Sequence, residues 1–285
     1  MKINKTAKDL WEPKRRIEIV YQRSLRLIMR KLEKELKGKT TLASILKTIK
    51  KFMKSEEFNN HAYASAKKMV TSVFTDEGKT WRTAANVNSK GRQIYEALKH
   101  EIDTTPIGIS IREQTERNAT LIKSMPERIR VEITDIVARE SINGRRASEI
   151  AEDLQERFPE MLKAKADLIA RTETSKTSTA LTKARCDNLG IKAYIWRSSE
   201  DGRVRDSHKK MDDVIIFWND PPSPEALVSE KNVGHYHPGN IYNCRCYPEP
   251  IIRLDFISWP HKVYWNNQIV RMSRKQFEEV AKLAA

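Results

Sequence analysis

Residues 169–197 read IARTETSKTSTALTKARCDNLGIKAYIWR, and within this stretch a helical pattern gives way to an extended one. A long helix is predicted after Pro159, from about Met161 to Asn188, and Gly190 is a typical C-terminal stop. Lys192 to Arg197 then alternate like a strand and are rich in Tyr, Ile and Trp. This transition predicts an α+β fold, helical in its first two-thirds and containing short strands after that.

Working towards the N-terminus, apolar residues recur at helical spacing through most of the chain. The periodicity and the capping signals predict helices over residues 16–36, 42–52, 61–74, 81–100, 128–140 and 148–158. Gly38, Gly78 and Gly144 are expected to end helices, and Thr104-Thr105-Pro106 is expected to form a turn.

Working towards the C-terminus, Val214 to Trp218 is a second short strand candidate. Residues 219–250 contain six prolines, so this segment is predicted to be mostly loop. Two apolar triplets, residues 263–265 and 268–270, flank Asn266-Asn267, as in a tight hairpin. Ser273 is expected to cap a terminal helix that runs through Lys282.

These elements suggest three parts. Residues 1–120 form a basic helical region, and residues 121–253 form a second part, with helices over 121–190 and short strands and loop over 191–253. Residues 254–285 add the hairpin and the last helix. A chain of 285 residues has room for one large domain or two modest ones.

Several protein classes are disfavoured by composition. No apolar stretch approaches the roughly 18 residues that a membrane span needs, so no membrane partner is expected. Residues 1–10 mix Lys and Asp and lack the apolar core of a signal peptide. The cysteines number only three, which favours a reducing compartment over a disulfide framework.

The positive charge is concentrated near the N-terminus. Residues 1–100 contain 24 Lys and Arg against 10 Asp and Glu, so +14 of the formal net charge of +15 lies there. This asymmetry predicts an acidic partner, most simply double-stranded DNA bound without sequence preference; a solvated, Lys-rich helical surface is the alternative. The candidate DNA contacts are Lys14, Arg15, Arg16, Arg23, Arg26, Arg30, Lys31, Lys34, Lys37 and Lys39.

Three polar segments stand out. The first contains Arg171, Thr172 and Glu173 on the predicted long helix. Because residues two apart on a helix do not face one another, Arg171 and Glu173 need separate partners. They either join a polar network with the loop at residues 201–208 or are ordinary exposed charges. The other two segments contain Trp196, Asp201, Arg203, Arg205 and His208, and then His237, Pro238, Asn243, Cys244, Arg245 and Cys246.

The last two segments contain a candidate metal site. Cys244 and Cys246 offer two soft ligands at a spacing too short for an easy mutual disulfide. With His237 and His208 they make a His2Cys2 set suited to structural zinc, although His235 competes with His237. The alternative is a purely structural role, with buried thiols and a hydrogen-bonded His237, or a polar network with Asp201 and Arg245.

In this order and spacing, the three segments resemble the phage head morphogenesis family that includes the Mu F protein. The shared pattern is I-A-R-T-E on a helix, then W and D-x-R-x-R-x-x-H, then H-P and N-C-R-C, and it covers about residues 120–250. One departure follows His208, where Met211-Asp212-Asp213 stands in place of the usual L-D-G. Residues 1–110 match no such motif.

The resemblance implies a low-copy minor head protein without catalytic activity. Such a protein is made in the host cytoplasm and lies in the capsid interior of the virion. Its expected partners are the portal protein, capsid or scaffolding proteins and packaged DNA. The main rival is a metal-dependent nuclease of the His-metal finger type, in which His235 or His237 acts with Asn243. A stand-alone DNA-binding regulator is a weaker rival, because no helix-turn-helix signal is evident.

Overall fold

The computed structural model describes residues 11–86, 94, 96, 98, 106–199 and 202–283. These residues form two compact units, each assembled from separate stretches of chain. The helical unit comprises residues 15–71 and 113–173, and the sheet unit comprises the described parts of 1–14, 72–112 and 174–285. Three long helices contribute to both units: α4 (Glu56–Asn86), α6 (Pro106–Ile142) and α7 (Ala147–Leu189). The α+β class predicted from the sequence is confirmed.

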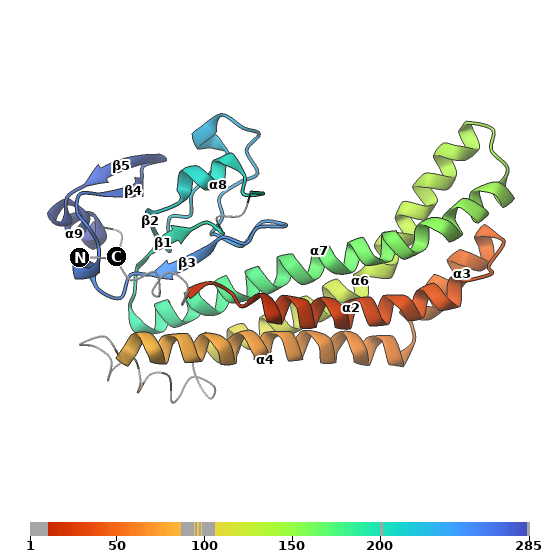
Figure 1. Ribbon diagram of the computed structural model, residues 1–285, viewed down its shortest axis with the longest axis horizontal. Helices are drawn as coiled ribbons and strands as arrows, with labels where there is room; N and C mark the ends of the chain where they lie inside the picture. Colours follow the sequence, from red (N-terminus) through yellow and green to blue (C-terminus); the bar gives the residue numbers. More distant parts are fainter. Residues whose placement is uncertain are drawn as a thin grey trace. The chain divides into compact units, whose positions relative to one another are not determined.

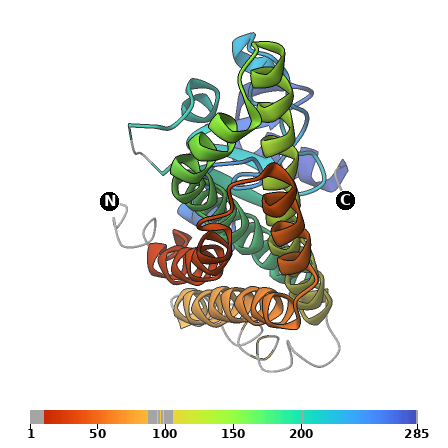
Figure 2. The same ribbon diagram turned by 90° about the vertical axis from the view of Figure 1, so that its right-hand side faces the viewer.

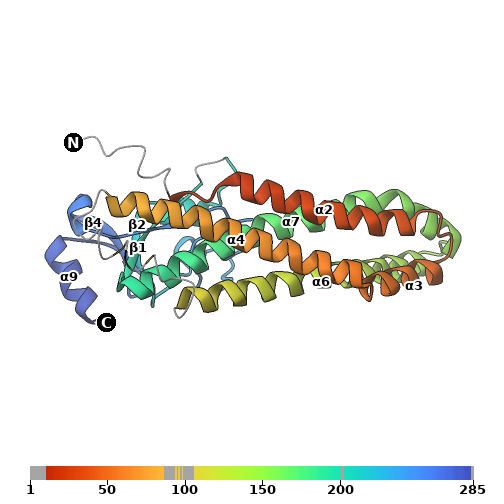
Figure 3. The ribbon, with the colours of Figure 1, turned by 90° about the horizontal axis from the view of Figure 1, so that it is seen from below.

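The helical unit is built around α2 (Arg15–Leu36), which is followed by α3 (Leu42–Met53). One face of α2 is buried at three- and four-residue spacing, as the periodicity predicted: Ile17, Tyr21, Leu25, Ile28, Met29, Leu32 and Leu36. Figure 3 shows α2, α4, α6 and α7 as separate long helices, and polar side-chain contacts join α2 to α6 and α7 within this unit. The Tyr21 hydroxyl donates to Asn118 of α6, and Arg26 pairs with Asp167 of α7.

Within the helical unit, α6 and α7 form a hairpin joined by residues 143–146 (Figures 1 and 2). Gly144 has a φ of +80° and ends α6, as predicted. Arg145 then closes the hairpin, because its guanidinium pairs with Glu140 of α6 at 3.3 Å and with Asp153 of α7 at 2.6 Å.

Two predicted helix boundaries were wrong. Gly78 does not end a helix but lies buried inside α4, where a Cβ would sit 3.7 Å from the guanidinium of Arg185, an ordinary contact distance. Pro159 lies inside α7 rather than before it. A proline costs the helix one backbone hydrogen bond, but the neighbouring Phe158 and Leu162 are buried and hold the helix in place. Residues 104–105 and most of the predicted helix at 81–100 lie outside the described residues.

The sheet unit contains five strands in the order β3-β1-β2-β4-β5. Their bounds are β1 (Ala193–Arg197), β2 (Val214–Phe217), β3 (Tyr247–Pro250), β4 (His261–Trp265) and β5 (Gln268–Met272). All the pairings are antiparallel except that of β2 with β4. The short helix α8 (Asp206–Met211) lies between β1 and β2 in the chain, and α9 (Arg274–Leu283) follows β5.

Residues 219–250 are mostly loop, as predicted, but they end in strand β3, where Tyr247–Pro250 pairs with β1. Two of its four residues, Pro248 and Pro250, cannot donate a ladder hydrogen bond. The next residue, Ile251, donates its N–H to the carbonyl of Ala193 in β1. Backbone N–H directions alternate along a strand, so the backbone nitrogens of both prolines point away from β1. They point to the open edge of the sheet, where no hydrogen-bond donor is needed.

Both faces of the sheet are buried. On one face, Tyr194, Trp196, Val214, Ile216 and Tyr264 form a cluster with apolar residues of α4 and α7 and with Cys244 and Cys246. On the other face, Ala193, Ile195, Ile215, Phe217 and Val263 form a cluster with Phe277 of α9. The alternation within β1 therefore divides its side chains between two cores.

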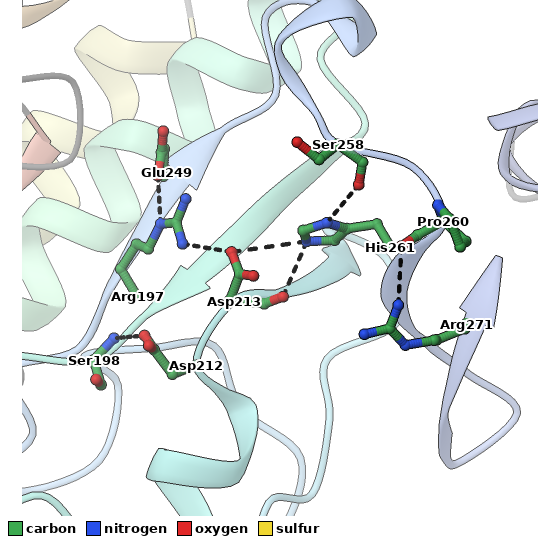
Figure 4. Close-up of polar contacts among 9 residues, drawn as sticks. All are labelled: Arg197, Ser198, Asp212, Asp213, Glu249, Ser258, Pro260, His261 and Arg271. Atoms are coloured by element: carbon green, nitrogen blue, oxygen red, sulfur yellow. Dashed lines mark hydrogen bonds and ion pairs between the residues drawn. The ribbon is translucent and has the colours of Figure 1, made fainter. Parts of the chain in front are cut away.

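A polar cluster ties four of the strands together (Figure 4). Arg197 of β1 donates to Glu249 of β3 at 2.5 Å and to Asp213, which precedes β2, at 2.7 Å. His261, the first residue of β4, has Nε2 3.0 Å from the carbonyl oxygen of Asp213. The contact between His261 and Asp213 therefore adds to the short backbone pairing of β2 with β4.

The C-terminal hairpin and helix are as predicted. Asn266 and Asn267 connect β4 to β5 with φ values of 49° and 61°, the conformation that a two-residue turn of type I′ needs and that Asn tolerates. Ser273 and Gln276 form a reciprocal cap at the start of α9, in which Gln276 accepts the N–H of Ser273 at 2.8 Å.

Candidate functional site

The candidate site is centred on His208, the third residue of the six-residue helix α8. The side chain is 2% exposed, and its ring meets the Trp196 ring of β1 edge-on at 5.5 Å. Trp196 is fully buried in the sheet. The orientation of His208 is therefore set by the packing of α8 on β1 rather than by solvent.

Two thiols meet His208 from a distant part of the chain. Its Nδ1 lies 3.5 Å from Sγ of Cys244 and 3.4 Å from Sγ of Cys246, and both cysteines are buried. Asn243, just before them, has a φ of 57°, a left-handed conformation that Asn tolerates better than most residues. Among the described residues, these three form the group of His, Cys and carboxylate side chains close enough to share a metal ion.

The far side of the imidazole contacts a tyrosine and a glutamate. Nε2 of His208 lies 2.9 Å from the Tyr236 hydroxyl, which donates to Oε1 of Glu225 at 2.6 Å. Burial, the hydrogen bond to Glu225 and the charge of Glu225 all raise the pKa of Tyr236, so the hydroxyl keeps its proton. Because that proton is directed to Glu225, the hydroxyl accepts from Nε2–H of His208, which leaves Nδ1 as the unprotonated nitrogen facing the sulfurs.

The two thiols differ in acidity. The pKa of Cys244 is held well below its usual value chiefly by a hydrogen bond from Cys246, against the effect of burial. The pKa of Cys246 is raised by Cys244 and by burial, while its contacts with Trp196 and the Ser199 backbone act in the other direction. When one of the two cysteines loses its proton, it is therefore Cys244, and the thiol of Cys246 donates a hydrogen bond to the resulting thiolate.

His237 is not in this group. Its Nδ1 is 3.0 Å from the Tyr194 hydroxyl, and its ring packs against Trp218 at 5.1 Å between centroids. Burial, aided by the positive charge of Lys183, lowers the pKa of His237 to about 4. The sequence offered His237 as a fourth ligand, whereas the structure places it beside two aromatic rings as a neutral, hydrogen-bonded side chain.

The loop that carries His237 is attached to α7. The hydroxyl of Thr179 donates to the carbonyl of Pro238 at 2.6 Å. Gly239 follows with a φ of +82°, and a Cβ at this position would lie 2.9 Å from Oγ1 of Thr179 and 3.2 Å from the carbonyl of Ser175. The H-P-G motif therefore needs its glycine, because the backbone approaches the helix too closely for a side chain.

The first predicted segment lies in the helical unit. Glu173 is buried and forms an ion pair with Arg117 of α6, and Nε of Arg171 is 3.7 Å from Glu18 of α2. Thr172 is buried. Glu173 is thus not an ordinary exposed charge, and these ion pairs are made with other helices rather than with the loop at residues 201–208.

The remaining motif residues lie at the surface or outside the described part. Arg203 and Asn243 are exposed, Arg245 is partly buried, and Asp201 lies outside the described residues. Arg205 donates to the carbonyl of Tyr242 at 3.1 Å and lies over its ring. This contact holds the start of α8 against the segment that leads into the two cysteines.

The residues of the nuclease alternative do not converge in the contacts described. His235 is exposed, with Nδ1 2.8 Å from the carbonyl of Pro221, and His237 contacts Tyr194.

The predicted DNA contacts fall into two groups. Arg26 and Lys31 are engaged in ion pairs with Asp167 and Glu57, and Lys14 and Lys39 are partly buried. The others are exposed along or just after α2: Arg15, Arg16, Arg23, Arg30, Lys34 and Lys37. Arg16, Arg23, Arg30 and Lys34 recur at helical spacing opposite the buried face of α2, and we call them the basic stripe.

Sequence reasoning missed three residues that make polar contacts between distant parts of the chain: Tyr236, Glu225 and Arg185. Tyr236 and Glu225 lie in the proline-rich segment, and no periodicity marks them as partners of His208. Arg185 of α7 is 1% exposed and pairs with Glu77 of α4 at 2.9 Å, and its guanidinium lies over the Phe74 ring. Residues 182–188, which include Arg185, are mostly polar and resemble an ordinary exposed helix surface in the sequence. Gly78 of α4, which the structure places near Arg185, was taken for a helix end.

One protein family model matches part of this chain. Residues 131–248, which include His208, Cys244 and Cys246, match the family model for Phage Mu protein F like protein. The chain carries a Mu F-like region. This region begins within α6 and ends in β3, so it contains the whole His208 site, and the resemblance seen in the three motifs is confirmed.

A longer relative extends the comparison beyond the Mu F-like region. An uncharacterized protein of Haemophilus influenzae is 26% identical over 234 residues, which is 82% of this chain and 47% of the relative. The chain therefore spans about half the length of the curated relative that it matches. No solved structure matches the chain. Among the described residues, no helix is both long enough and apolar enough to cross a membrane.

Proposed function

We propose that the protein is a minor head protein of a tailed bacteriophage, present in a few copies in the capsid interior. The observation that carries this proposal is the Mu F-like match over residues 131–248, because that family acts in phage head morphogenesis. The portal protein is the proposed primary partner, and capsid or scaffolding proteins are the other head components that it would meet during assembly.

Packaged double-stranded DNA is the second proposed partner. The exposed basic stripe on α2 and the +14 charge of residues 1–100 support contact with phosphates rather than with base edges. The family match supports a structural role rather than a catalytic one. The protein would act by binding, with the basic stripe facing the DNA during packaging or ejection.

The direct test is to look for the protein in phage particles. Purified procapsids and mature heads should contain it at a few copies per particle, measured by quantitative mass spectrometry against the portal protein as an internal standard. Co-expression with the portal protein should give a complex that survives gel filtration, and co-expression with the major capsid protein alone is the matched control. Absence from both kinds of particle would exclude the proposal.

A further inference from the structure

We propose that Nδ1 of His208 and the sulfurs of Cys244 and Cys246 bind a zinc ion. The proposal is independent of the role in the phage head, because it rests on the geometry of these three side chains. The zinc would join α8 to the chain segment just before β3, two parts that are 36 positions apart in the sequence.

The distances match those of a tetrahedral site. Zinc binds sulfur at about 2.3 Å and imidazole nitrogen at about 2.0–2.1 Å, so tetrahedral angles place the nitrogen about 3.6 Å from each sulfur. The observed separations of Nδ1 from the two sulfurs are 3.5 Å and 3.4 Å. The three ligand atoms also lie within 4.8 Å of one another, so the ion requires little movement of the side chains.

The tautomer of His208 also fits a metal ligand. Its Nε2–H is held by the Tyr236 hydroxyl, which is itself held by Glu225. Histidines that bind metals are typically oriented by such a donor contact, with a carboxylate at the end of the chain of hydrogen bonds. With Nε2–H donated to Tyr236, the neutral imidazole presents the lone pair of Nδ1 to the two sulfurs.

The charges balance in a buried setting. Two thiolates and a neutral imidazole bring the total charge to zero when a divalent ion is added, which suits side chains that are 2% to 3% exposed. The two cysteines also pack in a hydrophobic cluster with Tyr194 and Trp196 of β1. A metal would add a direct link between α8 and the segment before β3 to the order that this burial supplies.

His237 is excluded from the proposed ligand set. Its Nδ1 is occupied by Tyr194 and its ring is packed against Trp218. The three side chains leave one coordination position, which a water molecule would fill. A substitution at His237 thus separates the three-ligand site from the His2Cys2 set that the sequence pattern offered.

The experiment measures zinc in the full-length protein, purified without chelators or metal-affinity resin, by elemental analysis. We expect one zinc per chain in the unmodified protein and in Cys186→Ser, which removes a buried cysteine outside the site. Zinc should be lost in Cys244→Ser, Cys246→Ser and His208→Gln and kept in His237→Gln. Metal-free unmodified protein, or zinc retained in His208→Gln, would overturn the proposal, and zinc lost from His237→Gln would overturn the three-ligand set.

Two further measurements guard against variants that simply fail to fold. Cobalt(II) added to the zinc-depleted, reduced protein should give thiolate-to-metal charge-transfer absorption, and the same spectrum should appear in Cys186→Ser; absence of the band would contradict the site. Tyr236→Phe, which keeps both thiols, should weaken zinc binding about tenfold to a hundredfold in competition with a chromophoric chelator. Unchanged affinity, or a Cys244–Cys246 disulfide found by mass spectrometry of freshly prepared protein, would count against it.

Discussion

The hydroxyl of Thr179 on α7 donates a hydrogen bond of 2.6 Å to the backbone carbonyl of Pro238. This bond joins the buried, polar face of the long helix to the loop that leads into Cys244 and Cys246. Because Gly239 presses against the same turn of α7, the contact can be tested through its steric demand.

Substitution of Gly239 by Ala should destabilise the protein by about 3 kcal/mol, because the new Cβ adds a clash with Thr179 to the strain of a positive φ. Gly190→Ala is the matched control, with a φ of +67° and no atom within 4 Å of the added Cβ. It should cost only about 1–2 kcal/mol. Urea unfolding of both variants measures the difference; equal losses would show that the close approach to α7 does not matter.

Arg185→Met should cost about 3 kcal/mol or more, because it removes the guanidinium that pairs with the largely buried carboxylate of Glu77. Lys183→Met on the same helix removes a partner of Asp187 from a pair that is 39% and 46% exposed, and should change stability by less than about 0.5 kcal/mol. Both variants can be compared by the urea midpoint. Similar midpoints would mean that the Arg185 pair contributes no more than a surface pair.

The low pKa of His237 predicts a loss of stability in acid. Burial keeps His237 neutral down to about pH 4, with Lys183 adding to the effect and Asp187 opposing it. The unfolded chain takes up that proton near pH 6.5, so the folded state loses up to about 3 kcal/mol as the pH falls from about 6.5 to 4. At higher pH the contribution is fully present.

His237→Gln isolates this contribution, because Gln can still contact the Tyr194 hydroxyl but does not titrate. The unfolding free energy of the unmodified protein minus that of the variant should decrease between pH 7 and pH 4. The subtraction removes the acid sensitivity of the thiols and of other groups common to both proteins. A difference that is the same at both pH values would contradict the buried, neutral state of His237.

DNA binding should depend steeply on salt. If about five phosphates are neutralised, affinity for any duplex should fall by roughly three decades between 50 and 200 mM salt. Replacing Arg23, Arg30 and Lys34 of the basic stripe by Gln should lower affinity and reduce the slope of log affinity against log salt by about one unit for each lost contact.

The control for this experiment removes the same charge elsewhere. Lys262, Lys275 and Lys282 are exposed on β4 and α9, and their triple substitution by Gln should leave the slope nearly unchanged. Equal effects of the two triple variants would mean that net charge, rather than the basic stripe, governs binding. No effect of either would point to an acidic protein as the partner of α2.

Local features of the sequence determined much of this protein. The apolar stripe of α2, the glycine stop at Gly144 and the Asn266-Asn267 hairpin follow from the spacing and backbone preferences of neighbouring residues, and each was predictable for that reason. The three motifs identified the Mu F-like region, since side-chain types in a given order are visible without coordinates.

Only the tertiary structure decided the features that depend on partners distant in the chain. Pro248 and Pro250 are compatible with a strand because β3 lies at the sheet edge, and Gly78 lies inside α4, where it is buried beside Arg185. Tyr236 and Glu225 direct the lone pair of His208 at Cys244 and Cys246 through contacts across the fold. Sequence periodicity reports which residues share a face, but the protonation, burial and pairing of a side chain depend on what the fold places against it.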